Sequence, residues 1–209
     1  MKNTILQLDL VQANKQLKKL EPFQIIEWIM DLSDSPILTT NFGPYSASLI
    51  HAVNTINKDI PVIWCDTGYN TPQTYDYAHN LIDRFSLNIN IYRPKATSIF
   101  QHTTQAIPFI DTPEHKIFTE EVKLEPFSRA LKMHQPDVWF TNLRADQSEH
   151  RSTLDILHMS KDGILKVSPF FYYSEFDMEL YLQEFGLPNE KRYYDPTKVL
   201  AKRECGLHL

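Results

Sequence analysis

The sequence predicts an α/β fold, a Rossmann-like, doubly wound, mostly parallel sheet covered by helices. The chain has 209 residues, which is enough for one domain that buries its own core. Short apolar runs alternate with amphipathic segments, in the order strand, helix, strand, helix, strand over residues 35–93. This alternation is typical of a parallel sheet with crossover helices.

The first elements are predicted from apolar spacing and prolines. Residues 4–32 are expected to form two helices, the second of which restarts at Pro22. The apolar run behind the next proline predicts a buried strand that ends near Thr40. A turn and a helix over residues 46–56 follow.

The second and third strands flank a helix with a clear start. The second strand ends at Cys65 or Asp66, where the chain becomes polar. Thr71 is placed to cap the following helix, with Pro72 at its first position. The third strand alternates in polarity and stops at Pro94.

The middle of the chain is less regular. Residues 95–120 show no clear period, so we expect an irregular excursion over the sheet. A helix started by Pro126 and a further buried strand are expected next. The pair Asp162-Gly163 then predicts a hairpin.

The last helix is expected between Ser174 as its cap and Gly186 as its stop. After Pro188 the chain becomes polar. We therefore expect an α/β domain with an N-terminal helical element over residues 1–188, and a linker with a C-terminal tail over residues 189–209.

Composition limits the function classes. Hydrophobic residues make up 42% of the chain and charged residues 22%, as in ordinary globular proteins. A net charge of −5 argues against a non-specific nucleic-acid binder but allows an anionic small substrate. The sequence has neither a secretory pattern at its start nor an apolar stretch of bilayer length, so we expect a cytoplasmic protein that does not bind membranes.

Ligands bind to doubly wound sheets outside the carboxyl ends of the strands, and three loops follow strands here. The first, residues 39–48, offers hydroxyls, a glycine and the positive end of the next helix, which suits a phosphate. An ordinary strand-to-helix turn explains the same residues, so both interpretations stay open. The candidate ligands in this loop are Thr40, Asn41, Phe42, Gly43 and Ser46.

The second loop supplies Asp66, Thr67 and Gly68. A carboxylate at a strand end can bond a ribose hydroxyl, and the glycine permits a tight turn. Alternatively, the loop serves only to start the helix at Thr71. Cys65 closes an apolar run, which is more typical of an inert core residue than of a reactive thiol.

The third loop carries Arg144 and Arg151, seven residues apart. If this segment is helical, the spacing puts both guanidinium groups on one face, suited to phosphate or sulfate oxygens. Alternatively, they are surface partners of the acidic residues nearby. The pattern alone leaves these two interpretations open.

The tail holds Cys205, one of only two cysteines, among basic residues. Two cysteines cannot form a disulfide framework, which fits a reducing compartment. Nearby cations favour a thiolate and attract a polyanion, so Cys205 is the candidate nucleophile. An exposed cysteine without a role is the alternative. The tail residues expected to contact substrate are Lys202, Arg203 and His208.

With these segments in view, the chain resembles the phosphoadenylyl-sulfate (PAPS) reductases. The resemblance runs over residues 36–186 and resumes at Lys202. "NFGPYSASLIH" is similar to the family's pyrophosphate loop, and "DTGYNTPQTY", "KLEPFSRAL", "LRADQSEHR" and "KRECGLH" are similar to four further family motifs in the same order. Through the motif "KLEPFSRAL", which begins at Lys123, the resemblance adds Lys123 to the expected substrate contacts.

The resemblance implies an adenine nucleotide α-hydrolase-like fold and a reaction of assimilatory sulfate reduction that feeds cysteine biosynthesis. Cys205 would take the sulfonate from 3′-phosphoadenylyl sulfate (PAPS) as a cysteine S-sulfonate, and adenosine 3′,5′-bisphosphate would leave. Thioredoxin or glutaredoxin would then release sulfite. The resemblance also implies a homodimer. Relatives that use adenylyl sulfate carry further cysteines for an iron–sulfur cluster, and two cysteines cannot build that site, so we expect no bound cofactor or metal.

The chain departs from the family pattern in places. The family's "GD.H.T" element is missing before the tail, and Asn142 and Ala145 replace a glycine and an arginine. A nucleotide-binding paralogue without reductase activity is therefore an alternative. An ATP pyrophosphatase that adenylates its substrate is a second one, but the first loop lacks that group's "SGGxDS" pattern.

Overall fold

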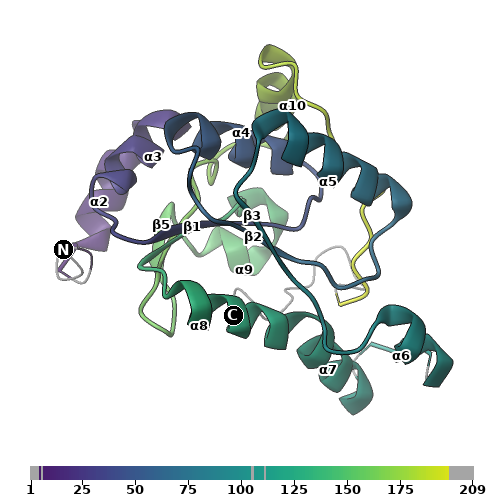
Figure 1. Ribbon diagram of the computed structural model, residues 1–209. Helices are drawn as coiled ribbons and strands as arrows, with labels where there is room; N and C mark the ends of the chain where they lie inside the picture. Colours follow the sequence, from purple (N-terminus) through teal and green to yellow (C-terminus); the bar gives the residue numbers. More distant parts are fainter. Residues whose placement is uncertain (1–4, 6, 105, 111, 198–209) are drawn as a thin grey trace.

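The computed structural model describes residues 5, 7–104, 106–110 and 112–197 (Figure 1). In this part of the chain, six strands form one sheet in the order β3-β2-β1-β4-β6-β5. Every neighbouring pair is parallel except β5 and β6. The strands are β1 Pro36–Thr40, β2 Val62–Cys65, β3 Ile89–Tyr92, β4 Val138–Phe140, β5 Leu157–Met159 and β6 Leu165–Val167. The predicted mostly parallel α/β sheet is confirmed.

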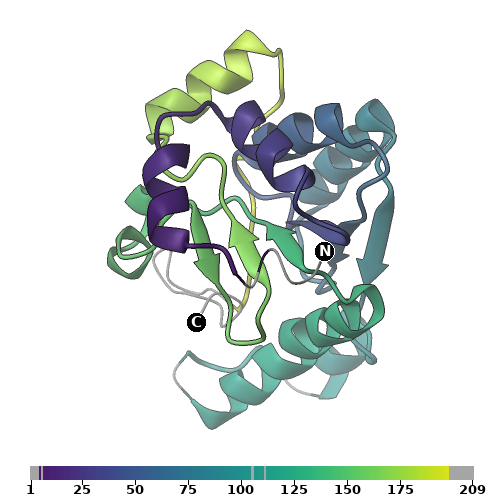
Figure 2. The same cartoon turned by 90° about the vertical axis from the view of Figure 1, so that its left-hand side faces the viewer.

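Helices cover both faces of the sheet (Figures 1 and 2). One face carries α3, α4, α5 and α10, whereas α8 lies on the opposite face. The helices are α2 Leu10–Leu17, α3 Pro22–Met30, α4 Ser46–Ile56, α5 Pro72–Phe85, α6 Ser98–Thr104, α7 Pro113–Thr119, α8 Glu125–His134, α9 Glu149–Ser152 and α10 Glu175–Glu184, with a π-helical turn η1 Glu120–Leu124 and a 3₁₀ turn η2 Ala145–Gln147.

The core follows the strand period of two. Leu38 and Phe140 point into the larger hydrophobic cluster under α3, α4 and α10, and both are fully buried. Their neighbours Ile37 and Trp139 point the other way, where they pack with Phe127 of α8. Because β4 is buried on both faces, it reads as a continuous apolar run in the sequence.

Two predicted helix starts and the predicted hairpin are present. The Thr71 hydroxyl accepts a hydrogen bond from the Thr74 amide at the start of α5, and Ser174 forms a capping box with Asp177 in α10. The hairpin between β5 and β6 turns at Gly163, whose φ is 76°. None of the helices in the described ranges is long and apolar enough to span a bilayer.

The prediction for residues 95–120 was wrong in part, because two short helices, α6 and α7, form there. The helix expected to start at Pro126 also begins earlier, since α7 continues through η1 into α8. Pro126 has no amide hydrogen to donate, and the wide π turn directly before it lets the helix change register at that point.

Candidate functional site

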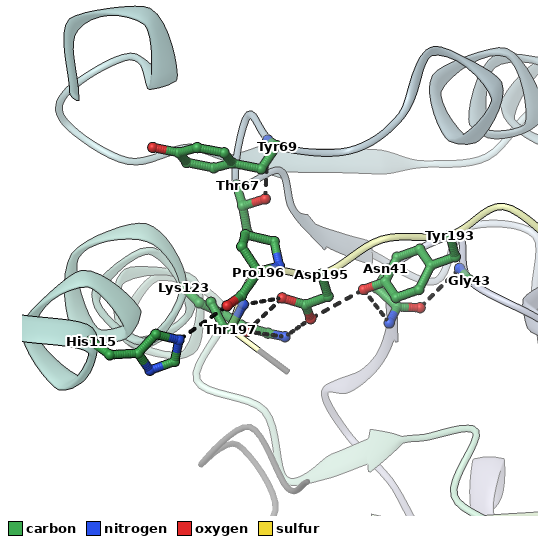
Figure 3. A network of polar contacts seen from close by, with 10 residues as sticks. All are labelled: Asn41, Gly43, Thr67, Tyr69, His115, Lys123, Tyr193, Asp195, Pro196 and Thr197. Atoms are coloured by element: carbon green, nitrogen blue, oxygen red, sulfur yellow. Dashed lines mark hydrogen bonds and ion pairs between the residues drawn. The ribbon is translucent and has the colours of Figure 1, made fainter. Parts of the chain in front are cut away.

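The candidate site lies at the carboxyl ends of β1, β2 and β4. In the sheet order, β2 and β4 flank β1 on its two sides, and all three run parallel. The loops that follow these strands therefore meet at one edge of the sheet, which is where doubly wound proteins bind ligands. Figure 3 shows polar side chains of the loops after β1 and β2 at this edge, together with Lys123 and residues 193–197.

The loop after β1 is held in a tight shape by its own side chains. The amide of Phe42 donates to Thr40 Oγ1 and that of Gly43 to Asn41 Oδ1, both at 3.0 Å. Phe42 has a positive φ of 51°, and its buried ring meets Trp64 edge-on at 4.9 Å. The amides expected to cradle a phosphate are thus bonded to protein groups in this structure.

The remaining members of this loop connect it to the helices. Tyr45 precedes α4 with a φ of 60°, and its amide donates to Asn189 Oδ1 at 2.9 Å. The hydroxyl of Ser46 donates to Tyr77 Oη at 3.3 Å, so Ser46 joins α4 to α5. Ser46 is buried, and this bond ties its hydroxyl to the helix layer.

Asp66 is buried after β2 and accepts bonds from several donors. Its Oδ1 accepts from the Gly68 amide at 3.0 Å and from the Tyr75 hydroxyl at 2.7 Å. Its Oδ2 accepts from Arg93 Nε at 3.1 Å. Burial, followed by the bond to Asp66, raises the pKa of Tyr75 to about 12. Thr67 accepts a bond from the Tyr69 amide, so this loop is also locked by local contacts.

Lys123 lies in the π turn η1 with only 5% of its surface exposed. Its ammonium donates to Asp195 Oδ2 at 2.5 Å and to Thr197 Oγ1 at 3.2 Å (Figure 3). π turns often occur at functional sites, because they aim a side chain that a regular helix would turn away. Here the turn directs a lysine toward the end of the described chain.

Arg144 follows β4 and is also 5% exposed. Its Nε donates to Asp146 Oδ1 at 3.1 Å, and its guanidinium lies over the ring of Tyr45. Its Nη1 is buried and has no hydrogen-bond partner within the described residues. Asn142 donates to the carbonyl of Tyr45, so the loops after β1 and β4 are in direct contact. Arg144 therefore offers an unused donor beside the loop after β1.

Arg144 and Arg151 do not lie on one helix, so the condition for placing both guanidinium groups on one helical face is not met. Arg144 caps η2, and Arg151 belongs to the separate short helix α9, which Ser148 caps. An extended residue at Ser148, with φ of −161°, breaks the segment into two pieces. Gln147 still joins them, because its Oε1 accepts from the Arg144 amide and from Arg151 Nη1. Arg144 does pair with the nearby acidic residue Asp146, as the alternative interpretation proposed, but Arg144 itself is buried and not at the surface.

Of the two cysteines, the structure describes Cys65 but not Cys205. Cys65 ends β2 and packs against the cluster under α8, as expected for a residue in the sheet. Cys205 and the tail residues expected to contact substrate lie outside the described residues. These tail residues are Lys202, Arg203 and His208.

Sequence reasoning missed three residues of the site. Tyr193, Asp195 and Thr197 fall in the polar stretch that the sequence predicts to be a linker, yet Asp195 and Thr197 are buried beside Lys123. A clue was available, because an Asp two residues before a Thr often forms a local turn through its carboxylate. Among the residues that the structure describes, no three His, Cys, Asp or Glu side chains are grouped as a metal site.

Comparison with known proteins adds a family match over most of the chain. Residues 35–195 match the model described as the phosphoadenosine phosphosulfate reductase domain. The chain is 33% identical to phosphoadenosine 5′-phosphosulfate reductase of Klebsiella pneumoniae subsp. pneumoniae, covering 96% of this chain and 92% of that protein. The protein of the same name from Escherichia coli O6:K15:H31 is 32% identical at the same coverage.

Solved structures agree on the fold. The crystal structure of phosphoadenylyl-sulfate reductase from Candida auris, a phosphate complex, matches with a TM-score of 0.77 at 22% identity, covering 88% of this chain and 89% of that one. FMN adenylyltransferase from Candida glabrata matches with a TM-score of 0.59 at 11% identity, covering 90% of this chain and 62% of that one. At these identities the likeness describes the fold alone.

Proposed function

The chain belongs to the phosphoadenosine phosphosulfate reductase family, and on this premise we propose that it reduces PAPS to sulfite and adenosine 3′,5′-bisphosphate. One observation carries the proposal beyond the family match. The loop after β1 lies against a buried arginine, Arg144, whose Nη1 has no hydrogen-bond partner in the described part of the chain. A buried donor without a partner is costly, and an anionic oxygen is the ligand that a guanidinium binds best.

The first chemical step belongs to Cys205. Its thiolate attacks the sulfur of the sulfonate group, a sulfur–sulfur bond forms, and the bond from that sulfur to the bridging oxygen breaks. Adenosine 3′,5′-bisphosphate leaves with that oxygen and its electron pair. The product on the protein is a cysteine S-sulfonate, and no external electrons have been used.

The second step needs an external dithiol such as reduced thioredoxin or glutaredoxin. One thiolate of the carrier attacks the Cys205 sulfur and releases sulfite, which takes the electron pair of the broken sulfur–sulfur bond. The second thiol of the carrier resolves the mixed disulfide, so the carrier is oxidised and Cys205 is restored. A reducing compartment such as the cytoplasm supplies such carriers.

Charge neutralisation is the role proposed for the basic residues of the site. A thiolate that approaches a polyanionic nucleotide is repelled unless cations offset the charge that develops. Lys123, Arg144 and Arg151 supply this positive charge, with Lys202 and Arg203 on the tail. Asp66 and its loop would face the nucleoside. With two cysteines the reaction proceeds without an iron–sulfur cluster, which favours PAPS over adenylyl sulfate.

Intact-mass spectrometry after mixing the protein with PAPS, with no reductant present, tests the proposal. We expect one added sulfonate group per chain, mapped to Cys205 by peptide analysis. Cys205→Ser should bind adenosine 3′,5′-bisphosphate but form no adduct, and the matched variant Cys65→Ser should form it. An adduct on another residue, or none on the parent chain, contradicts the mechanism. Release of pyrophosphate from ATP would favour the adenylating alternative.

A further inference from the structure

The last described residues of the chain form an anchor between two parts of the site. This anchor, residues 193–197, bonds on one side to the loop after β1 and on the other to η1 and α7 (Figure 3). His115 of α7 bonds through Nε2 to the carbonyl of Pro196 at 3.1 Å. The anchor is thus fixed to segments that are far apart in the sequence.

Asp195 is the centre of the anchor. Its Oδ1 accepts from the amide and the hydroxyl of Thr197, at 3.0 and 2.6 Å. Its Oδ2 accepts from Lys123 Nζ at 2.5 Å and from the Tyr193 hydroxyl at 3.2 Å. Asp195 is 8% exposed and Lys123 5%, so the pair is shielded from water and each charge depends on the other.

Tyr193 extends the same network to the loop after β1. Its hydroxyl accepts from Asn41 Nδ2 at 2.8 Å, and Asn41 Oδ1 accepts from the Gly43 amide. The Tyr193 ring also packs over Gly43, where an added Cβ would come within 3.3 Å of it. One hydrogen-bond network therefore links the loop after β1, Lys123 and the anchor.

We infer that Asp195 and Tyr193 are positioning residues that fix the root of the catalytic tail, meaning the anchor at residues 193–197 from which the tail continues. This inference rests on the proposed function. Cys205 stands eight positions after Thr197, so the thiol can reach at most about 26–29 Å from it. Fixing this root confines the thiol near the bound nucleotide and raises its effective concentration there.

Asp195 could instead compete with the nucleotide for Lys123, and the two roles predict opposite effects on binding. Removing a competitor tightens nucleotide binding. Removing a positioning residue slows the sulfonate transfer at saturating nucleotide while affinity stays close to that of the parent. A change that only weakens the fold lowers the melting temperature without this split between rate and affinity.

The test compares Tyr193→Phe and Asp195→Asn with the matched controls Tyr194→Phe and Asp59→Asn, both at exposed positions. Three quantities are measured for each folded variant: the melting temperature, the affinity for adenosine 3′,5′-bisphosphate, and the single-turnover rate of S-sulfonation of Cys205 at saturating PAPS. We expect the anchor variants to react about 10- to 100-fold more slowly than the controls, with affinity within about threefold of the parent.

Three other outcomes overturn the inference, each in a distinct way. Unchanged rates in both anchor variants mean that the root does not need fixing. Tighter nucleotide binding in Asp195→Asn identifies Asp195 as a competitor. If Asp195→Asn does not fold, Tyr193→Phe, which removes only one hydroxyl, decides alone. A parent chain that forms no adduct contradicts the proposed function itself, and the role of the anchor falls with it.

Discussion

The guanidinium of Arg144 lies 5.0 Å from the centre of the Tyr45 ring, which couples the end of β4 to the loop after β1. A planar guanidinium can stack on a ring and still present two nitrogens side by side to a ligand, whereas a lysine ammonium is a compact charge without this bidentate geometry. The stacked position also explains how a buried cation is held without a full set of hydrogen bonds.

Arg144→Lys should therefore lower kcat/KM for PAPS by about 100-fold, although the charge is kept. The loss should appear equally in the affinity for adenosine 3′,5′-bisphosphate if Nη1 contacts a phosphate. Arg84→Lys is the matched control, because Arg84 lies at the end of α5 and bonds the carbonyl of Gly186. Equal activity of the two variants would contradict a role for Arg144 in anion binding.

Asp66→Asn and Tyr75→Phe separate a nucleoside contact from a structural one. Tyr75→Phe removes the bond from the Tyr75 hydroxyl to Asp66 Oδ1 and Asp66→Asn weakens it, so each change should lower the free energy of unfolding by about 1 kcal/mol. Only Asp66→Asn removes the carboxylate that we expect to face a ribose hydroxyl. Steady-state kinetics should show a higher KM for PAPS in Asp66→Asn alone. Equal KM values in the two variants would assign Asp66 a purely structural role.

Gly43→Ala tests the contact with Tyr193. Gly43 has an ordinary φ, so the backbone accepts alanine, but the new Cβ would lie 3.1 Å from Asn41 Oδ1 and 3.3 Å from the Tyr193 ring. We expect a small change in melting temperature and a clear loss of S-sulfonation rate. Gly68→Ala provides the contrast, because its φ of 79° makes alanine strained and should cost about 1 kcal/mol of stability. A Gly43→Ala protein with the parent's rate would show that the ring can move freely.

His158 predicts a pH dependence of stability. Burial, and then the Lys166 ammonium opposite it in the β5–β6 pair, lower the pKa of His158 from 6.5 to about 4. The unfolded chain therefore takes up a proton near pH 6.5 that the folded chain takes up only near pH 4. As the pH falls through this window the free energy of unfolding decreases, by at most about 2 kcal/mol at pH 5.

Thermal unfolding at pH 7 and pH 5 checks this expectation. Between pH 7 and pH 5, the melting temperature of His158→Gln should fall by less than that of the parent. His79→Gln, at an exposed position of α5, is the matched control for the substitution itself. An identical slope in His158→Gln and the parent would mean that another group carries the dependence.

Sequence patterns predicted most of the fold because many helices and strands begin and end at residues whose side chains bond nearby backbone groups or restrict the backbone. Thr71 and Ser174 cap their helices through bonds to amides three residues away, which a sequence pattern contains directly. Pro126 misled the same reasoning. A proline typically starts a helix, but here tertiary packing continues the helix through a π turn, which no single-sequence period announces.

The candidate site was predictable only in its strand-end loops. Each loop follows an apolar strand, so Asn41, Asp66 and Arg144 could be placed at one edge by topology alone. The contact of Lys123 with Asp195 joins residues 72 positions apart, and that of Asn41 with Tyr193 joins residues 152 apart. Such pairings depend on where the polar stretch at residues 193–197 packs, and its composition does not predict this.

The π turn at Glu120–Leu124 has a consequence for comparing this chain with its relatives. Each residue of an α-helix advances the side-chain direction by about 100°. A relative that lacks one residue of this turn would rotate its lysine by about a quarter of a circle relative to α8, out of reach of an aspartate placed like Asp195. A single-residue gap at this point in an alignment therefore indicates that the lysine side chain points in a different direction, even where all residues of the motif are the same.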